Sequence, residues 1–232
     1  MSARCLLLPA VFLLPGAPLA PAPGGADKEL AAALRKAAAL DSYGFRVEEA
    51  PARSPGGAVE CQYQKGRPLF CRADGIDFYR RDEVLVYEQG GRWQRTRRGT
   101  VSDPLRILAA SAKVARVRLP HEELALLAGG LTGVKGKRRE KGVSVYEAAL
   151  TDEGVRKLAP SEFRGVARGG TARFRVNDDQ VVVGYTLTFR LKGSLGNAEV
   201  DGEATRTVEI RDPGSTRVDP PAGAREALQQ GE

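Results

Sequence analysis

The segment Val181-Val-Val-Gly-Tyr185-Thr-Leu187-Thr-Phe189-Arg-Leu191 carries the clearest periodic signal in the sequence. Large apolar residues occupy every second position, and glycine, threonine, valine or arginine occupies the positions between them. Side chains of a β-strand alternate between the two faces of a sheet, so this pattern predicts a long strand with one apolar face. Tyr43, Phe45 and Val47 show the same alternation near the N-terminus. Both strands need other elements to cover their apolar faces.

Three predicted amphipathic helices are available as this cover, over residues 27–40, 104–114 and 120–127. If the helices pack flush on the strands, the result is a solid core. If they stand away from the sheet, the result is an apolar pocket, and the sequence leaves both arrangements open. The residues that would line such a pocket are Tyr43, Phe45, Val47, Val183, Tyr185, Leu187, Phe189 and Leu191.

Short strands with tight turns predict the rest of the sheet. Asp74-Gly75 and Gly90-Gly91 are typical of such turns. The further candidate strands cover residues 58–63, 69–73, 76–80, 84–88, 92–96, 131–139, 143–150, 170–176 and 199–210. Runs of strands interrupted by helices favour the α+β class with one large antiparallel sheet.

A short leader precedes the first predicted helix. Arg4 is followed by an apolar run of roughly ten residues and then by small residues, which is the order found in signal peptides. A membrane span needs about 20 apolar residues, and no run in the chain is that long. We therefore expect a signal peptide over residues 1–26, one domain without a transmembrane span over 27–221 and a flexible tail over 222–232. The expected location is the periplasm or cell envelope, and an unprocessed leader is the alternative.

Cys61 and Cys71 flank a predicted turn centred on Gly66. In a hairpin they would lie directly opposite each other, at a Cβ separation of about 4.5–5.5 Å. Bridging at this separation requires a non-hydrogen-bonded pair and some strand twist. An even number of cysteines in an exported domain favours a disulfide, and a pair of buried thiols is the alternative. Without a C-x-x-C motif, neither a zinc site nor a redox role is expected.

The motifs of common enzymes are missing. The glycines between Gly129 and Lys137 lack the spacing and the following Ser or Thr of a P-loop. His121 is the only histidine, and no G-x-S-x-G motif accompanies it. Asn177-Asp-Asp fits a turn rather than a calcium loop. We expect no enzyme activity, no cofactor and no metal, and an envelope enzyme stays a third alternative.

Basic charge is concentrated in residues 92–141, which contain 13 basic and four acidic residues in a chain of net charge +7. A solvated surface is the simplest interpretation, and attraction to anionic lipid headgroups or to an acidic partner is the alternative. Export and the lack of interleaved aromatic residues argue against nucleic acid as a partner. The two clusters of the segment are Arg95, Arg97 and Arg98, and Lys135, Lys137, Arg138, Arg139 and Lys141.

The order of these elements carries a resemblance to a known family. Its motifs are Ser42-Tyr-Gly-Phe-Arg-Val47, Val84-Leu-Val-Tyr87-Glu-Gln-Gly-Gly-Arg-Trp93, Val143-Ser-Val-Tyr146-Glu-Ala-Ala-Leu150, Ile210-Arg-Asp-Pro-Gly214 and Val218-Asp-Pro-Pro221. Over residues 27–221 this order resembles the fold shared by the lipoprotein carrier LolA and the LppX/LprG lipid-binding lipoproteins. The pair Tyr87 and Trp93 is similar to a segment that those proteins place in the middle of the sheet.

The resemblance implies an incomplete, curved β-barrel whose concave face is covered by helices and whose hydrophobic cavity takes up acyl chains. It implies a non-enzymatic, exported binding protein for a lipid or a lipoprotein, with a membrane-bound donor or acceptor protein as a partner. LolA-type carriers hold their lid shut with an arginine, and no single arginine of this chain can be matched to it. The chain also lacks a lipobox, and the pair Cys61 and Cys71 is not a family feature. The alternative is an envelope-sensing or scaffold module of the same fold that acts through protein contacts.

Overall fold

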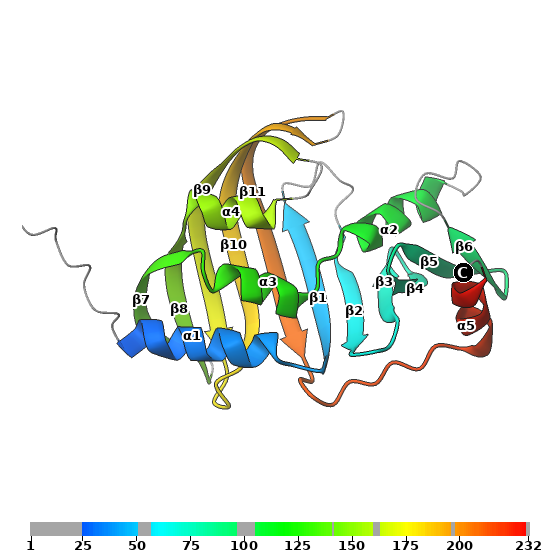
Figure 1. Ribbon diagram of the computed structural model, residues 1–232, viewed down its shortest axis with the longest axis horizontal. Helices are drawn as coiled ribbons and strands as arrows, with labels where there is room; N and C mark the ends of the chain where they lie inside the picture. Colours follow the sequence, from blue (N-terminus) through cyan, green and yellow to red (C-terminus); the bar gives the residue numbers. More distant parts are fainter. Residues whose placement is uncertain are drawn as a thin grey trace, which may run out of the picture.

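Eleven antiparallel strands form one open, curved sheet in the computed structural model, which describes residues 25–50, 57–96, 105–140, 142–159, 163–195 and 198–230 (Figure 1). The strand order is β6-β5-β4-β3-β2-β1-β11-β10-β9-β8-β7. The strands are β1 (Ser42–Ala50), β2 (Val59–Gln64), β3 (Leu69–Ala73), β4 (Ile76–Arg81), β5 (Val84–Gln89), β6 (Arg92–Thr96), β7 (Leu131–Glu140), β8 (Val143–Leu150), β9 (Phe163–Val176), β10 (Val182–Leu195) and β11 (Ala198–Arg211). The predicted α+β class and single antiparallel sheet are confirmed.

The chain builds this sheet in two halves. Strands β1 to β6 follow one another as a meander, and strands β7 to β11 form a second meander. The two halves meet where β1 pairs with β11, from Gly44 opposite Arg211 to Ala50 opposite Thr205. The first strand of the chain therefore lies in the middle of the sheet, beside the last.

Four helices cover one face of the sheet. Helices α1 (Gly25–Ala38), α3 (Pro120–Leu127) and α4 (Asp152–Leu158) lie over one half, and α2 (Leu105–Arg116) packs on β3 and β4 (Figure 1). Their apolar stripes share one core with the sheet. Thr151 caps α4, because its hydroxyl accepts a hydrogen bond from the Gly154 N–H at 3.0 Å. Asp27, the first residue of the helix predicted over 27–40, lies within the first turn of α1.

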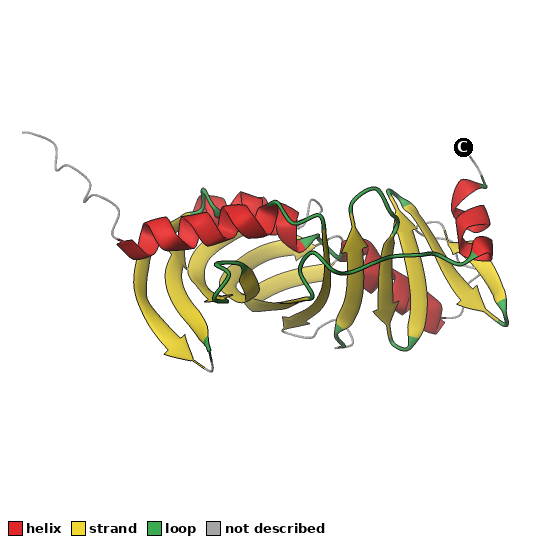
Figure 2. Cartoon of the chain, turned by 90° about the horizontal axis from the view of Figure 1, so that it is seen from below, coloured by secondary structure: helices red, strands yellow, loops and turns green. Residues whose placement is uncertain are grey.

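The C-terminal residues form a fifth helix on the opposite face. The flexible tail expected over residues 222–232 is wrong for most of its length, since Ala222–Gln229 is helix α5. Its buried residues Ala224, Ala227 and Leu228 join a second apolar cluster with Tyr79 and Val86. Neighbours along a strand point to opposite faces of the sheet. Phe78 belongs to the first core, so its neighbour Tyr79 and helix α5 lie on the other face. A segment without secondary structure links β11 to α5 across the strands between them (Figure 2).

Two bulges interrupt the pairing of β9 and β10. One extra residue of β10 lies between Val182 and Gly184, where the register shifts by one. At the second bulge, Gly169 and Gly170 of β9 lie opposite the single residue Phe189. A Cβ atom on Gly170 would lie 1.9 Å from the Thr188 carbonyl oxygen, so only glycine fits at this position.

Residues 1–24 of the predicted signal peptide lie outside the described residues. Among the helices of the described part, none is both long and apolar enough to cross a membrane.

Candidate functional site

The interface between α3 and the sheet contains both charged side chains that are buried in the described part of the chain. Helix α3 begins at Pro120, lies beside α1 and α4 and buries Leu124 and Leu127 completely. The same inner face of this helix also carries a carboxylate, Glu123, which is only 2% exposed. A buried carboxylate among leucines requires partners.

The residues predicted to line a cavity lie between this helix layer and the sheet. All but one are buried in a single cluster with Leu30 and Leu34 of α1 and with Leu124 of α3. These seven residues are Tyr43, Phe45, Val47, Tyr185, Leu187, Phe189 and Leu191. The structure thus brings them together under the helices, closed from solvent.

Val183 is the exception among the predicted lining residues. It is half-buried and does not belong to the core cluster, whereas Val182 beside it is fully buried. The bulge between Val182 and Gly184 adds one residue to β10 and so shifts the alternation of faces at this point. The strict period of two predicted from the sequence holds only from Tyr185 onward.

Glu123 binds two partners from the sheet. Its Oε2 atom accepts a hydrogen bond from the Tyr185 hydroxyl of β10 at 2.5 Å and from Nε of Arg206 of β11 at 3.0 Å. The remaining nitrogens of Arg206 donate to the Glu49 carboxylate and, at 3.5 Å, to the Arg118 carbonyl oxygen. Arg206 is 8% exposed. One buried guanidinium therefore ties α3 and the chain before it to β1 and β11.

Burial and charge act in opposite directions on this cluster. Burial tends to lower the pKa of Arg206, but Glu123, Tyr185 and Glu49 outweigh it and the net pKa is raised. Burial, followed by the charge of Glu123, raises the pKa of Tyr185 well above its ordinary value. At neutral pH the site therefore holds a charged guanidinium and a protonated phenol, both of which donate to the Glu123 side chain.

A second polar contact lies at the start of α3. The Tyr43 hydroxyl of β1 is 2.6 Å from Nδ1 of His121 and accepts the His121 backbone N–H at 3.3 Å. The His121 ring also packs on Tyr63, with ring centroids 4.7 Å apart. Burial lowers the pKa of His121, with Glu122 opposing the shift, and burial raises that of Tyr43. The contact therefore joins a neutral imidazole to a protonated phenol.

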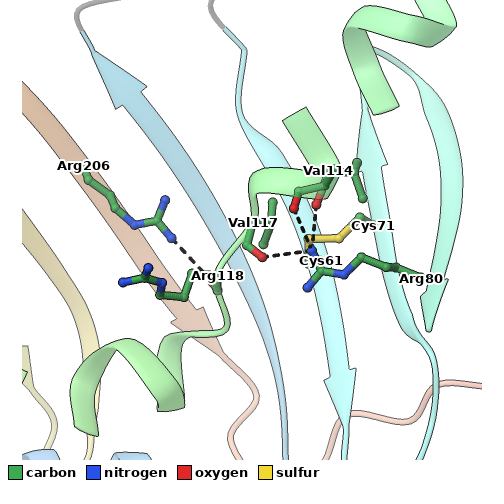
Figure 3. The surroundings of a disulfide bond; sticks show 8 residues. Cys61, Cys71, Arg80, Val114, Val117, Arg118 and Arg206 are labelled. Atoms are coloured by element: carbon green, nitrogen blue, oxygen red, sulfur yellow. Dashed lines mark hydrogen bonds between the residues drawn. A yellow bond between two sulfur atoms is a disulfide. The ribbon is translucent and has the colours of Figure 1, made fainter. Parts of the chain in front are cut away.

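The segment between α2 and α3 is held by two arginines from different halves of the sheet (Figure 3). Arg80 of β4 donates from Nη1 to the carbonyl oxygens of Val114 at 2.9 Å and Val117 at 3.0 Å. Arg206 donates to the carbonyl oxygen of Arg118 on the other side. Arg80 thus fixes the end of α2, and Arg206 fixes the beginning of the chain that leads into α3.

Cys61 and Cys71 form a disulfide between β2 and β3, beneath this segment (Figure 3). They lie opposite each other in the register, as the hairpin centred on Gly66 predicts, and their Cα atoms are 4.1 Å apart. Both cysteines belong to the core under α2. The disulfide fixes the part of the sheet on which the end of α2 rests.

The two basic clusters predicted from the sequence do not form one patch. Arg95 lies on β6 and Lys135, Arg138 and Arg139 lie on β7, and these two strands are the opposite edges of the sheet (Figure 1). Arg95 donates to the carbonyl oxygen of Gln230 after α5. Arg97, Arg98 and Lys141 lie outside the described residues, and Lys137 is described only as part of the β7 backbone. Strands β6 and β7 follow each other along the chain, with only α2 and α3 between them, but they lie at opposite edges of the sheet.

The sequence analysis missed Glu123 and Arg206, although each leaves a signal. Glu123 falls on the helical stripe that contains Pro120, Leu124 and Leu127, and Arg206 falls in the β11 alternation beside Val208. A charged residue on the apolar face of a helix and one of opposite charge on the apolar face of a strand can form a buried pair. Only the tertiary structure shows that these two faces meet. Among the described residues, no group of three or more His, Cys, Asp or Glu side chains could hold a metal ion.

Comparisons with known proteins find similarity at the level of the fold. No family model and no curated protein sequence matches the chain. The crystal structure of LprF from Mycobacterium bovis is 12% identical, with a TM-score of 0.53 over 84% of this chain and 96% of that one. The lipoprotein LppX from Mycobacterium tuberculosis is 13% identical, with a TM-score of 0.51 over 84% and 97%. The protein therefore has the fold of LprF and LppX, in agreement with the resemblance in its sequence.

Proposed function

We propose that the protein is an exported, non-enzymatic carrier that holds the acyl chains of a lipid or lipoprotein between its sheet and helices α1 and α3. The proposal is supported by the fold that it shares with LprF and LppX, the second of which is described as a lipoprotein. It is also supported by the continuous apolar layer between the sheet and the helices. In this layer α3 is the element that would move.

The observation that carries the proposal is the ion pair between Glu123 and Arg206 in an otherwise apolar layer. Burying two charges costs several kcal/mol per ion, so apolar residues of similar size often hold two elements together as well or better. A permanent contact gains little from such a pair. When α3 leaves the sheet, both charges of the pair return to water, so such a pair suits a helix that has to move. In this proposal Arg206 is the arginine that holds the lid shut, which the sequence alone could not assign.

Acyl chains would replace the contacts that α3 gives up. Moving α3 outward exposes the apolar faces of Leu124, Leu127 and Leu187, all of which are fully buried in the closed form. Each buried CH2 group contributes about 0.8 kcal/mol, so one acyl chain supplies on the order of 10 kcal/mol. Arg80 keeps the end of α2 in place as far as Val117, so Arg118 and Leu119 are the expected hinge. The basic residues on β7 would meet anionic headgroups.

The test is native mass spectrometry of the full chain purified from its exported compartment, followed by organic extraction. We expect bound lipid, and uptake of lipid from vesicles by protein that has been stripped of it. The variant Leu187→Gln places a polar group in the apolar layer and should reduce the bound fraction at least tenfold. A matched control, Leu228→Gln, makes the same change in the cluster under α5, on the other face of the sheet, and should retain lipid.

Protein that carries no lipid and takes up none from vesicles would overturn the carrier function. This outcome does not depend on whether either variant folds. That result would favour the alternative function, an envelope-sensing or scaffold module that acts through protein contacts.

A further inference from the structure

His121 is the only histidine of the chain and lies at the start of the helix that the carrier function would move. Helix α3 begins at Pro120 beside β1 (Figure 1). His121 therefore stands between the expected hinge, which ends at Leu119, and Glu123, whose ion pair holds the helix to the sheet. Histidine is the side chain whose ordinary pKa allows a change of charge between about pH 5 and 8. At this position such a change can act on the movement of α3.

The hydrogen bonds around the Tyr43 hydroxyl determine which ring nitrogen of His121 carries the proton. The hydroxyl oxygen accepts the backbone N–H of His121 at 3.3 Å and lies 2.6 Å from Nδ1. Tyr43 is fully buried, and its hydroxyl has no other partner among the described residues. The hydroxyl proton is therefore bonded only when it points at an unprotonated Nδ1, with the ring proton on Nε2. In this arrangement every group of the contact has a partner.

Protonation of the imidazole breaks this arrangement. Nδ1 then carries a proton and can only donate to the Tyr43 oxygen, which already accepts the backbone N–H. The hydroxyl proton is left buried without an acceptor, a state that folded proteins avoid. The new positive charge also lies in the first turn of α3, at the positive end of the helix dipole. Two independent effects thus disfavour the charged imidazole while α3 is closed.

The other groups around the imidazole oppose these effects only in part. The ring of Tyr63 packs on it, and Glu122 is the one described charge that acts on it; both favour a cation. The exposed pair of Asp41 and Lys65 acts on Tyr63 behind it. Helices α1 and α4 pack beside α3 with buried residues that carry no charge. Burial outweighs these groups, so the pKa of His121 is lowered.

We propose that the contact between Tyr43 and His121 is a pH-sensitive switch, which holds α3 closed while the imidazole is neutral and releases the N-terminal end of the helix when the imidazole takes up a proton. Once this end leaves β1, water satisfies both the charged ring and the Tyr43 hydroxyl. The purpose of the release rests on the proposed function, since α3 is the helix that would admit acyl chains. The release itself needs no ligand.

The size of the effect follows from the proton balance. In the open form His121 is in water and has the ordinary pKa of about 6.5, whereas the closed form holds the pKa lower. The open form therefore takes up a proton first as the pH falls, and the ratio of open to closed molecules rises until the pH passes the pKa of the closed form. Between pH 7.5 and 5.5 one proton can raise this ratio by at most about tenfold.

Hydrogen exchange of the full chain without lipid, at pH 7.5 and 5.5, measures the release. The observed rates are divided by the intrinsic rate at each pH, because acid slows the exchange of every free amide. We expect the protection of the α3 amides to fall between threefold and tenfold at pH 5.5. It should stay below that of the slowest amides of the sheet at both pH values, since the helix opens without the unfolding of the sheet.

Two variants and one control identify the group. His121→Gln can still bond to the Tyr43 hydroxyl but cannot titrate, so the protection of α3 should be the same at both pH values. Tyr43→Phe removes the hydroxyl whose proton loses its acceptor, so the effect of pH should shrink at least twofold. Tyr63→Phe is the matched control, because Tyr63 packs on the same imidazole and its ring remains, and it should respond to pH as the wild type does.

Three outcomes would overturn the switch: the same protection of α3 in the wild type at both pH values, a loss in acid that His121→Gln leaves unchanged, or exchange of α3 only together with the slowest amides of the sheet. In the last case His121 would act on unfolding of the whole sheet and not on the helix. Because this experiment contains no lipid, the switch and the carrier function can fail independently.

Discussion

The hydroxyl of Tyr43 in β1 takes the place of a helix cap for His121 in α3. The residue before this helix, Leu119, makes no side-chain cap hydrogen bond, so the first N–H groups of α3 need another acceptor. Tyr43 accepts one of them and its hydroxyl also bonds to the imidazole. The sheet thereby supplies the cap that the helix sequence lacks, at the N-terminal end of α3.

Replacing Tyr43 by phenylalanine should destabilise the protein by about 1–2 kcal/mol, because a buried N–H group and the imidazole both lose a partner. The measurement is urea unfolding of the variant beside the wild type. Tyr63→Phe is the control, since Tyr63 also packs on His121 but its hydroxyl bonds to no described residue. Equal losses in the two variants would contradict the capping role.

The stability of the protein should fall as the pH drops below about 6.5, the ordinary pKa of histidine. Burial holds the pKa of His121 lower than this in the folded state. The unfolded chain therefore takes up a proton at a pH where the folded chain does not, and each further drop in pH favours unfolding until the folded pKa is passed. Urea midpoints between pH 7.5 and 5 measure the effect. His121→Gln should flatten the curve, and an unchanged slope in that variant would refute the assignment.

Breaking the pair of Glu123 and Arg206 from one side should cost about 3–5 kcal/mol, because a buried charge then remains without its partner. Glu123→Leu and Arg206→Met are the single variants. The double variant should recover most of the loss but bind lipid more slowly, since α3 then lacks its releasable contact. Arg139→Met gives the scale for an exposed pair, because Arg139 and Asp178 are 66% and 77% exposed, and should cost less than about 1 kcal/mol. A double variant no more stable than either single variant would argue against the pair.

Loss of the disulfide should lower the free energy of unfolding by about 2–3 kcal/mol, the range for a short closed loop. The variant Cys61→Ser/Cys71→Ser tests this in urea, and mass measured after alkylation with and without reductant tests the pairing itself. The end of α2 rests on this part of the core, so hydrogen exchange should rise there first. The same alkylated mass with and without reductant would show that the thiols are not bridged.

The strands and most helices could be predicted from the sequence because their signals are local. Alternation marks Tyr185 to Leu191, and glycine-containing turns separate β2 from β3, β3 from β4 and β5 from β6. Helix α5 was missed because it is short and rich in alanine, although Ala224, Ala227 and Leu228 have helical spacing. Its burial depends on Tyr79 and Val86, which lie far away in the chain.

The candidate site was harder to predict because it joins residues that no local pattern relates. Tyr43 and Tyr185 were identified as apolar lining residues, and the structure adds that each hydroxyl is bonded to α3. Glu123 and Arg206 interrupt apolar stripes, and only the tertiary structure shows that they compensate each other. The prediction of one basic patch was wrong for the same reason. The order of strands in the sheet places β6 and β7 at opposite edges, although they are close in the sequence.

The pairing of β1 with β11 also determines when the sheet can be completed. A chain that emerges N-terminus first during its synthesis can form the meander from β1 to β6 from local contacts, with the disulfide inside it. Strand β11 is the last of the strands to emerge, so until then β1 keeps one row of backbone groups unpaired. Non-local pairing of this kind folds slowly. A chain halted after β10 would carry two half-sheets with open edges at β1 and β10, which are sites for a holding chaperone or for aggregation.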